Sequence, residues 1–84
     1  MEIAAVINIG PVLADRLSAI GITTLEDLQA AGDSAIFGQL STRFPEEACV
    51  HTRLALAGAV RGIRWHHLPA AIKAVAKEEV QSAK

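Results

Sequence analysis

The sequence contains few of the residues that build sheets, disulfides or metal sites. It has no tyrosine, two phenylalanines, one tryptophan and a single cysteine among its 84 residues. One cysteine cannot form a disulfide within the chain or a cysteine-rich zinc site, and this usage is typical of a reducing compartment. We therefore predict a cytoplasmic protein. Sustained alternation of apolar and polar residues is also absent, which disfavours β-strands.

An excess of charge of either sign is missing as well. Eight Lys and Arg residues face nine Asp and Glu residues, so the net charge is −1. A strongly basic protein that binds nucleic acid without specificity is therefore disfavoured. The longest charge-free segment near the N-terminus, residues 3–14, is too short and too interrupted to span a bilayer, and no basic region precedes it. We expect neither a targeting segment nor a membrane contact.

Alanine and leucine are abundant, and both favour helices. Glycine and proline divide the chain into short periodic segments, in which Leu13, Leu17 and Ile20 form one apolar stripe. We expect Gly21 and Gly32 to end helices and Thr23 or Thr24 to begin one. The predicted helices span residues 11–20, 24–31, 33–42, 45–62 and 69–76, with a short turn over residues 2–7 and a fraying end over residues 77–84.

The predicted helix over residues 45–62 differs from the others. At 100° per residue, its apolar or small side chains lie on nearly every side, which is typical of a helix surrounded by others. Gly58 and Gly62, four residues apart, would let another helix approach closely. The sequence thus predicts an all-α fold, a compact bundle of about five short helices in a single domain over residues 1–84.

Two glycine turns begin the chain. Each has an apolar residue beside a glycine and is followed by a helix, which is a helix-hairpin-helix pattern. Such a turn exposes backbone N–H groups at the next helix's N-terminus, where an anion can bind. The two turns are Asn8-Ile9-Gly10-Pro11 and Ile20-Gly21-Ile22.

The ordered set of residues from Asn8 to Pro69 resembles the C-terminal domain of the TfoX (Sxy) family of bacterial competence regulators. The resemblance implies a small all-helical domain with a helix-hairpin-helix-like start, in a bacterial, cytoplasmic regulatory protein. Full-length TfoX proteins carry a further N-terminal domain, and Met1 favours a standalone relative. The matching residues are Asn8-Ile9-Gly10, Leu13-Ala14, Leu17, Gly21-Ile22, Thr24, Asp27-Leu28, Gly32, Cys49, Leu54-Ala55-Leu56-Ala57-Gly58-Ala59, Gly62, Trp65, Leu68 and Pro69.

Candidate contacts for nucleic acid or another anion fall into two groups. Gly10 and Gly21 stand in the glycine turns, although residues 1–32 hold four acidic residues and one arginine. Arg53, Arg61 and Arg64 lie along one edge of this predicted helix if it is continued from residue 62 to Arg64, in the more basic part of the chain. The alternatives stay open: glycines that serve only to form turns, and arginines that form a solvated rim.

Candidate contacts for a protein partner are Trp65, His66 and His67. A lone tryptophan between two helices either closes the core or anchors an interface. His51 and Cys49 point to different sides of a helix, and neighbouring histidines cannot easily share one tetrahedral ion. We therefore expect no metal, no cofactor and an inert, buried Cys49 thiol.

Motifs of phosphate-binding loops, nucleophile elbows and zinc hydrolases are missing, so we expect no enzyme and no small-molecule substrate. The sequence predicts a non-catalytic regulatory or interaction module that contacts a protein partner or forms a homodimer. The alternative is a weak DNA-binding module that uses the glycine turns or the arginine edge. Binding of the first kind would be insensitive to salt, and binding of the second kind would weaken steeply as salt rises.

Overall fold

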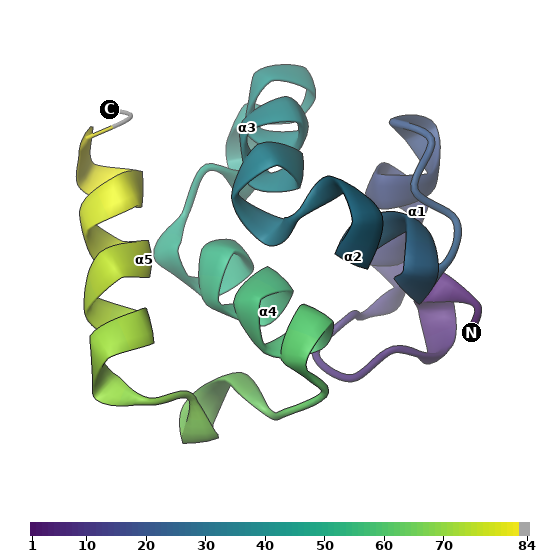
Figure 1. The fold of residues 1–84 in the computed structure, drawn as a ribbon. Coiled ribbons are helices and arrows are strands. Elements are labelled where there is room, and N and C mark those ends of the chain that lie inside the picture. Colours follow the sequence, from purple (N-terminus) through teal and green to yellow (C-terminus); the bar gives the residue numbers. More distant parts are fainter. Residues whose placement is uncertain (83–84) are drawn as a thin grey trace.

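The chain folds into five α-helices and three 3₁₀ turns over residues 1–82, the part that the computed structural model describes (Figure 1). A single bridge between Glu2 and Thr24 is the one β pairing in those residues. The predicted all-α class is therefore confirmed. In chain order the elements are η1 (Ile3–Ala5), α1 (Pro11–Ala19), α2 (Leu25–Ala31), α3 (Asp33–Arg43), η2 (Pro45–Glu47), α4 (Val50–Arg61), η3 (Trp65–His67) and α5 (Ala70–Ser82).

Local signals in the sequence set most helix ends. Gly21, after α1, has a φ of +88°, and Gly62, after α4, has a φ of +71° in the left-handed region. Thr24 begins α2 with a capping box: its hydroxyl accepts a hydrogen bond from the Asp27 amide, and the Asp27 carboxylate accepts one from the Thr24 amide. These contacts satisfy amides that the first helical turn leaves without carbonyl partners.

The capping box supports a prediction about stability. The variant Thr24→Ala should unfold about 1 kcal/mol more easily, because it loses the hydroxyl that caps α2. Urea denaturation followed by circular dichroism measures this. Thr42→Ala is the matched control, since Thr42 is exposed on α3 and its hydroxyl only donates back to the Gly38 carbonyl. Equal losses in the two variants would contradict the assigned cap.

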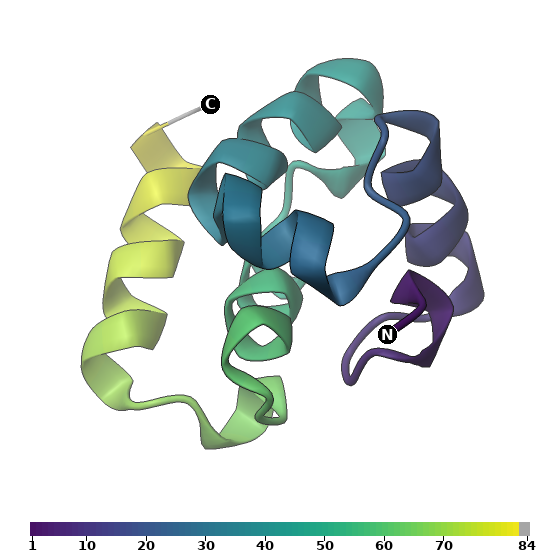
Figure 2. The ribbon, with the colours of Figure 1, turned by 45° about the vertical axis from the view of Figure 1, so that its right-hand side comes forward.

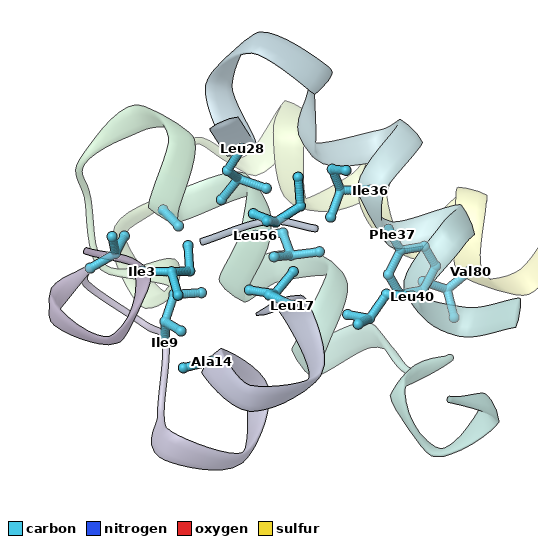
Figure 3. Close-up of a cluster of buried hydrophobic side chains, with 13 residues drawn as sticks. Ile3, Ile9, Ala14, Leu17, Leu28, Ile36, Phe37, Leu40, Leu56 and Val80 are labelled. Atoms are coloured by element: carbon cyan, nitrogen blue, oxygen red, sulfur yellow. The ribbon is translucent and has the colours of Figure 1, made fainter. Parts of the chain in front are cut away.

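Helix α4 lies in the middle of the molecule, with α5 on one side and α1 to α3 on the other (Figures 1 and 2). Eight consecutive residues, Thr52 to Ala59, are buried, as expected for a central helix. The larger apolar cluster joins side chains from all five helices, including Leu17, Leu28 and Leu56 (Figure 3). The smaller cluster packs α4 against η3 and α5 and consists of Leu54, Ala57, Leu68 and Ala76.

The beginning of α4 was predicted incorrectly. Pro45–Glu47 form the separate turn η2, and Cys49 is extended, with φ −135° and ψ 160°. The Glu47 carboxylate explains the break, because it accepts a hydrogen bond from Thr52 at 2.8 Å and pairs with Arg16 of α1 at 3.1 Å. Cys49 is consequently half-buried at the helix end, with its sulfur 3.3 Å from the Thr52 hydroxyl.

The predicted fraying of residues 77–82 is also wrong. Helix α5 continues to Ser82, because Val80 is buried in the larger cluster and Glu79 pairs with Arg53 of α4. The last two residues of the predicted fraying segment, 83 and 84, lie outside the described part of the chain.

Candidate functional site

Asn8 joins the first loop to the end of α4. Its side-chain amide donates hydrogen bonds to the carbonyls of Ile63 at 2.9 Å and Ala55 at 3.4 Å, and its oxygen accepts one from the Trp65 amide at 3.2 Å. Its φ of +71° lies in the left-handed region, which asparagine tolerates better than most residues. Gly58 leaves room for this contact, so the predicted close approach at Gly58 is made by a side chain and a loop, not by another helix.

Trp65 anchors a group of aromatic rings next to this junction. Its ring stacks on His66, with centroids 4.0 Å apart and planes at 25°, and it meets His51 edge-on at 5.2 Å. Trp65 is half-buried against the smaller apolar cluster, whereas His51 and His66 are exposed. We call His51, Trp65 and His66 the aromatic surface. The half-buried Trp65 ring suits both roles that the sequence suggested, closing the core and anchoring an interface.

A shallow groove extends from His51 to the first glycine turn. It is lined on one side by Gly10, Pro11 and Val12, and Val12 is 61% exposed despite being apolar. The structure therefore brings the predicted contacts Gly10, Trp65 and His66 to one side of the molecule. Sequence reasoning missed His51 as a member of this surface, because only the return of the chain along α4 places Trp65 beside it.

The Gly21 turn has no amide available for an anion. The amides of Gly21 and Ile22 donate to carbonyls of α1, and the Leu25 amide donates to the Met1 carbonyl. The two threonine amides between them donate to the Asp27 carboxylate. The Thr23 amide and the other hydrogen bonds to this carboxylate hold the pKa of Asp27 below its ordinary value. A carboxylate of the chain therefore already occupies the position at which the sequence predicted an anion beside Gly21.

Arg53 is likewise not part of an exposed edge. Its side chain is 5% exposed, and its guanidinium binds Asp33 at 2.8 Å, Ser34 at 2.7 Å and Glu79 at 3.0 Å. These partners come from α3 and α5, so Arg53 ties both helices to α4. The guanidinium for which the sequence predicted an external anion is thus buried and paired within the chain.

The other two arginines of the predicted edge differ from each other. Arg61 donates to the Ala57 carbonyl at 2.8 Å and lies 3.5 Å from the Asp33 carboxylate. Arg64 is exposed and makes no ion pair with any residue of the described range 1–82. Of the three arginines, Arg64 alone presents its charge freely to a ligand.

The ion pairs of Arg53 with Asp33 and Glu79 are expected to make the stability of the protein sensitive to acid. Burial by itself would raise the pKa of Asp33, but the hydrogen bond and charge of Arg53 outweigh it and lower that pKa. The pKa of Glu79 is lowered too, chiefly by its hydrogen bond from Arg53. Groups with lowered folded pKa values contribute stability above their unfolded pKa, about 4, and lose it as the pH falls through the folded value. The melting temperature should therefore decrease when the pH is lowered below about 4. Arg53→Met should weaken this dependence, and an unchanged dependence in that variant would contradict the assignment.

The described residues offer neither a metal site nor a membrane-spanning helix. No group of three or more His, Cys, Asp or Glu side chains in residues 1–82 could hold a metal ion. None of the helices in the same range has the length and apolar character needed to cross a bilayer.

The geometry defines a class: a small all-helical domain in which glycine-turn helices pack on a buried central helix, and in which an asparagine ties the first turn to a tryptophan. The sequence model of the TfoX C-terminal domain matches residues 1–80. The chain belongs to the TfoX C-terminal domain family, as the resemblance predicted.

Two solved structures, both from Listeria monocytogenes, are similar over nearly the whole chain. One, an uncharacterised protein in a triclinic crystal, has a TM-score of 0.94 and 35% identity over 99% of this chain and 93% of its own. The other, a protein of unknown function in a tetragonal crystal, has a TM-score of 0.87 and 38% identity over 92% of this chain and 93% of its own. No curated protein matches the chain.

Proposed function

We propose that the protein is a non-catalytic regulatory module of the bacterial cytoplasm that acts through protein contacts at the aromatic surface. The observation that carries this proposal is the half-buried Trp65 ring between two exposed histidines, of which His51 lines a groove together with the exposed Val12. Tryptophan set among partly exposed rings is enriched at the centres of protein interfaces. A homodimer through the same surface is one form of this proposal.

Binding of DNA is the second candidate, and two features near the aromatic surface favour it: free amides at the start of α1 and the charge of Arg64. The amides of Val12 and Leu13 stand in the first turn of α1, where the helix provides no carbonyl acceptors, and Arg64 is exposed. However, Gly21 and Arg53 are committed to internal partners, and the exposed Asp15 carboxylate belongs to the same helix as the free amides. The electrostatic attraction that dominates non-specific DNA affinity is therefore small.

A recovery experiment with matched variants tests the protein-contact proposal. The immobilised protein is incubated with extract of the bacterium that encodes it, alongside Val12→Asp, His66→Asp and the control Gln39→Asp. Gln39 is exposed on α3, away from the aromatic surface. We expect a defined partner to be retained by the wild type and the control and lost by the other two. Retention by all four proteins would contradict the proposal.

Anisotropy titrations test the DNA alternative. Mixed-sequence duplex and single-stranded DNA are titrated at about 50 and 200 mM salt, an interval that exposes counterion release. We expect no binding at protein concentrations of about 100 µM, within the range of ordinary non-specific dissociation constants. Tight binding at the lower salt that collapses at the higher salt, and that weakens in Arg64→Ala, would establish DNA as the ligand.

A further inference from the structure

A long segment of the chain has basic residues without any acidic ones. Residues 48–77 contain no Asp or Glu, while they hold five Lys or Arg residues and all three histidines. This run covers α4, η3 and most of α5. Because these elements pack on one another, the imbalance in sequence becomes an imbalance on one part of the surface.

Some of these cations are paired with carboxylates in the fold, and others have no such partner. Arg53 is paired internally, and Arg61 lies beside Asp33. Lys73 donates to the His66 carbonyl at 2.7 Å, which places its ammonium group at η3. Lys77 follows one helical turn later on the same face of α5 and is exposed. Arg64, Lys73 and Lys77 make no ion pair with any carboxylate in residues 1–82.

Polar and aromatic groups suited to a contact lie between Arg64 and Lys73 in the chain, at the turn that the Lys73 ammonium group reaches. His66 and His67 are exposed, with ring centroids 6.4 Å apart, and His66 lies on the Trp65 ring. We call Arg64, His66, His67, Lys73 and Lys77 the basic surface. It offers three full positive charges, ring donors and an aromatic face within one short stretch of η3 and α5.

We propose that the basic surface docks an acidic segment of a partner protein. The proposal rests on the proposed function and adds the chemistry of the partner: carboxylates that face Arg64, Lys73 and Lys77, and an apolar side chain that packs on the His66 and Trp65 rings. Complementary charge favours encounter and excludes like-charged competitors, while the ring contact supplies apolar area. Because exposed charges are screened, this binding should weaken as salt rises, unlike the salt-insensitive protein contact expected from the sequence.

An acidic protein segment fits this surface better than a nucleic acid does. Three uncompensated cations release few counterions, and residues 1–32 of the same small molecule carry four acidic residues against one basic residue. Phosphates of a strand that extends past the basic surface toward these carboxylates are repelled by them at close range. A protein segment can place its carboxylates opposite the basic surface and leave the acidic side of the domain uncovered.

The test uses the full chain and two peptides of defined sequence. The first peptide is acetyl-Glu-Leu-Glu-Glu-Leu-Glu-amide, and the second has lysine in place of each glutamate. Amide and indole shifts in nuclear magnetic resonance spectra report binding. We expect the acidic peptide to shift residues 64–77 and the Trp65 indole, and the basic peptide to leave them unchanged. Hexaglutamate should bind more weakly than the leucine-containing peptide, because it lacks the apolar contact.

Charge-reversal variants make the test specific. The double variant Arg64→Glu, Lys73→Glu should weaken the apparent affinity for the acidic peptide about tenfold or more, as loss of close charge pairs does. Arg43→Glu is the matched control, because Arg43 is an exposed cation on α3 outside the basic surface. We expect it to change the affinity by less than about twofold.

Several results would overturn this inference. They are an absence of shifts at residues 64–77, equal effects of Arg43→Glu and the double variant, or tighter binding of a short DNA strand to the same amides. Self-association that Arg64→Glu abolishes, measured by sedimentation of the protein alone, would assign the surface to a second copy. If the peptide fails but a partner is still lost in Val12→Asp, the acidic partner is rejected while the proposed function stands. If the acidic peptide does not bind and no partner is lost in the variants, both the acidic partner and the proposed function are rejected.

Discussion

Gly58→Ala is expected to lower the free energy of unfolding by about 2 kcal/mol, although alanine is the better helix former by about 1 kcal/mol. A Cβ at this position would collide with the Asn8 side-chain nitrogen and the Ile63 carbonyl oxygen, and it would lie 3.3 Å from the Trp65 amide nitrogen. The Ile63 carbonyl belongs to the backbone and cannot rotate away. Relief of the clash must therefore disturb the hydrogen bonds by which Asn8 joins α4 to η3.

Gly38→Ala is the matched control for this prediction. Gly38 lies inside α3, it is exposed, and an added Cβ would meet no atom within 4 Å. The substitution should stabilise the protein by about 0.5–1 kcal/mol, because alanine restricts the unfolded chain and suits a helix. Urea denaturation followed by far-UV circular dichroism compares the two. Stabilisation by both substitutions would show that Asn8 does not pack against α4 as described.

Arg53→Met is expected to be the most destabilising of the substitutions considered, with a loss of about 3 kcal/mol. For a domain of this size, that corresponds to a fall in melting temperature of about 15 °C. Methionine fills part of the space but leaves the Asp33 carboxylate, 18% exposed, without its partner at 2.8 Å. Glu79 is 38% exposed and regains water more easily, so most of the loss comes from Asp33 and Arg53 themselves.

The position of Arg53 distinguishes this result from a general effect of removing an arginine. Arg43→Met removes a charge that is exposed on α3, and we expect a change within about 0.5 kcal/mol. A double-mutant cycle with Glu79→Gln should give a coupling energy of about 1 kcal/mol, since the two side chains are in direct contact. A loss in Arg53→Met no greater than that in Arg43→Met would contradict a buried, paired guanidinium.

Local patterns in the sequence were sufficient for several helix ends and for the central helix. Gly21 and Gly32 placed the ends of α1 and α2, and Thr23 or Thr24 was expected to begin α2, because these signals act within one helical turn. The all-round apolar pattern over residues 45–62 identified the central helix, since a helix buried on every side needs no polar face. The capping pair of Thr24 and Asp27 was also readable, and it would have predicted that the Gly21 turn is closed to anions.

Other features had no readable signal. The helical angles placed Arg53 together with Arg61 and Arg64. Such angles describe side chains along one helix, and they carry no information about the carboxylates of α3 and α5 that cover Arg53. The start of α4 was missed for the same reason. Glu47 is held by Arg16, a residue of α1 far away in the sequence, and Pro45 alone suggests a helix start.

The sequence by itself therefore determined the all-α class, most helix ends, the central helix and the family. It did so because backbone conformation and apolar periodicity depend on neighbours within a few residues. The tertiary structure decided which polar groups remain available, because Arg53 and the amides of the Gly21 turn are bonded to partners within the chain. It also brought Gly10, His51 and Trp65 to one side of the molecule. A charge or an amide is available only if no partner from another element reaches it. That depends on distances between elements, which packing alone sets.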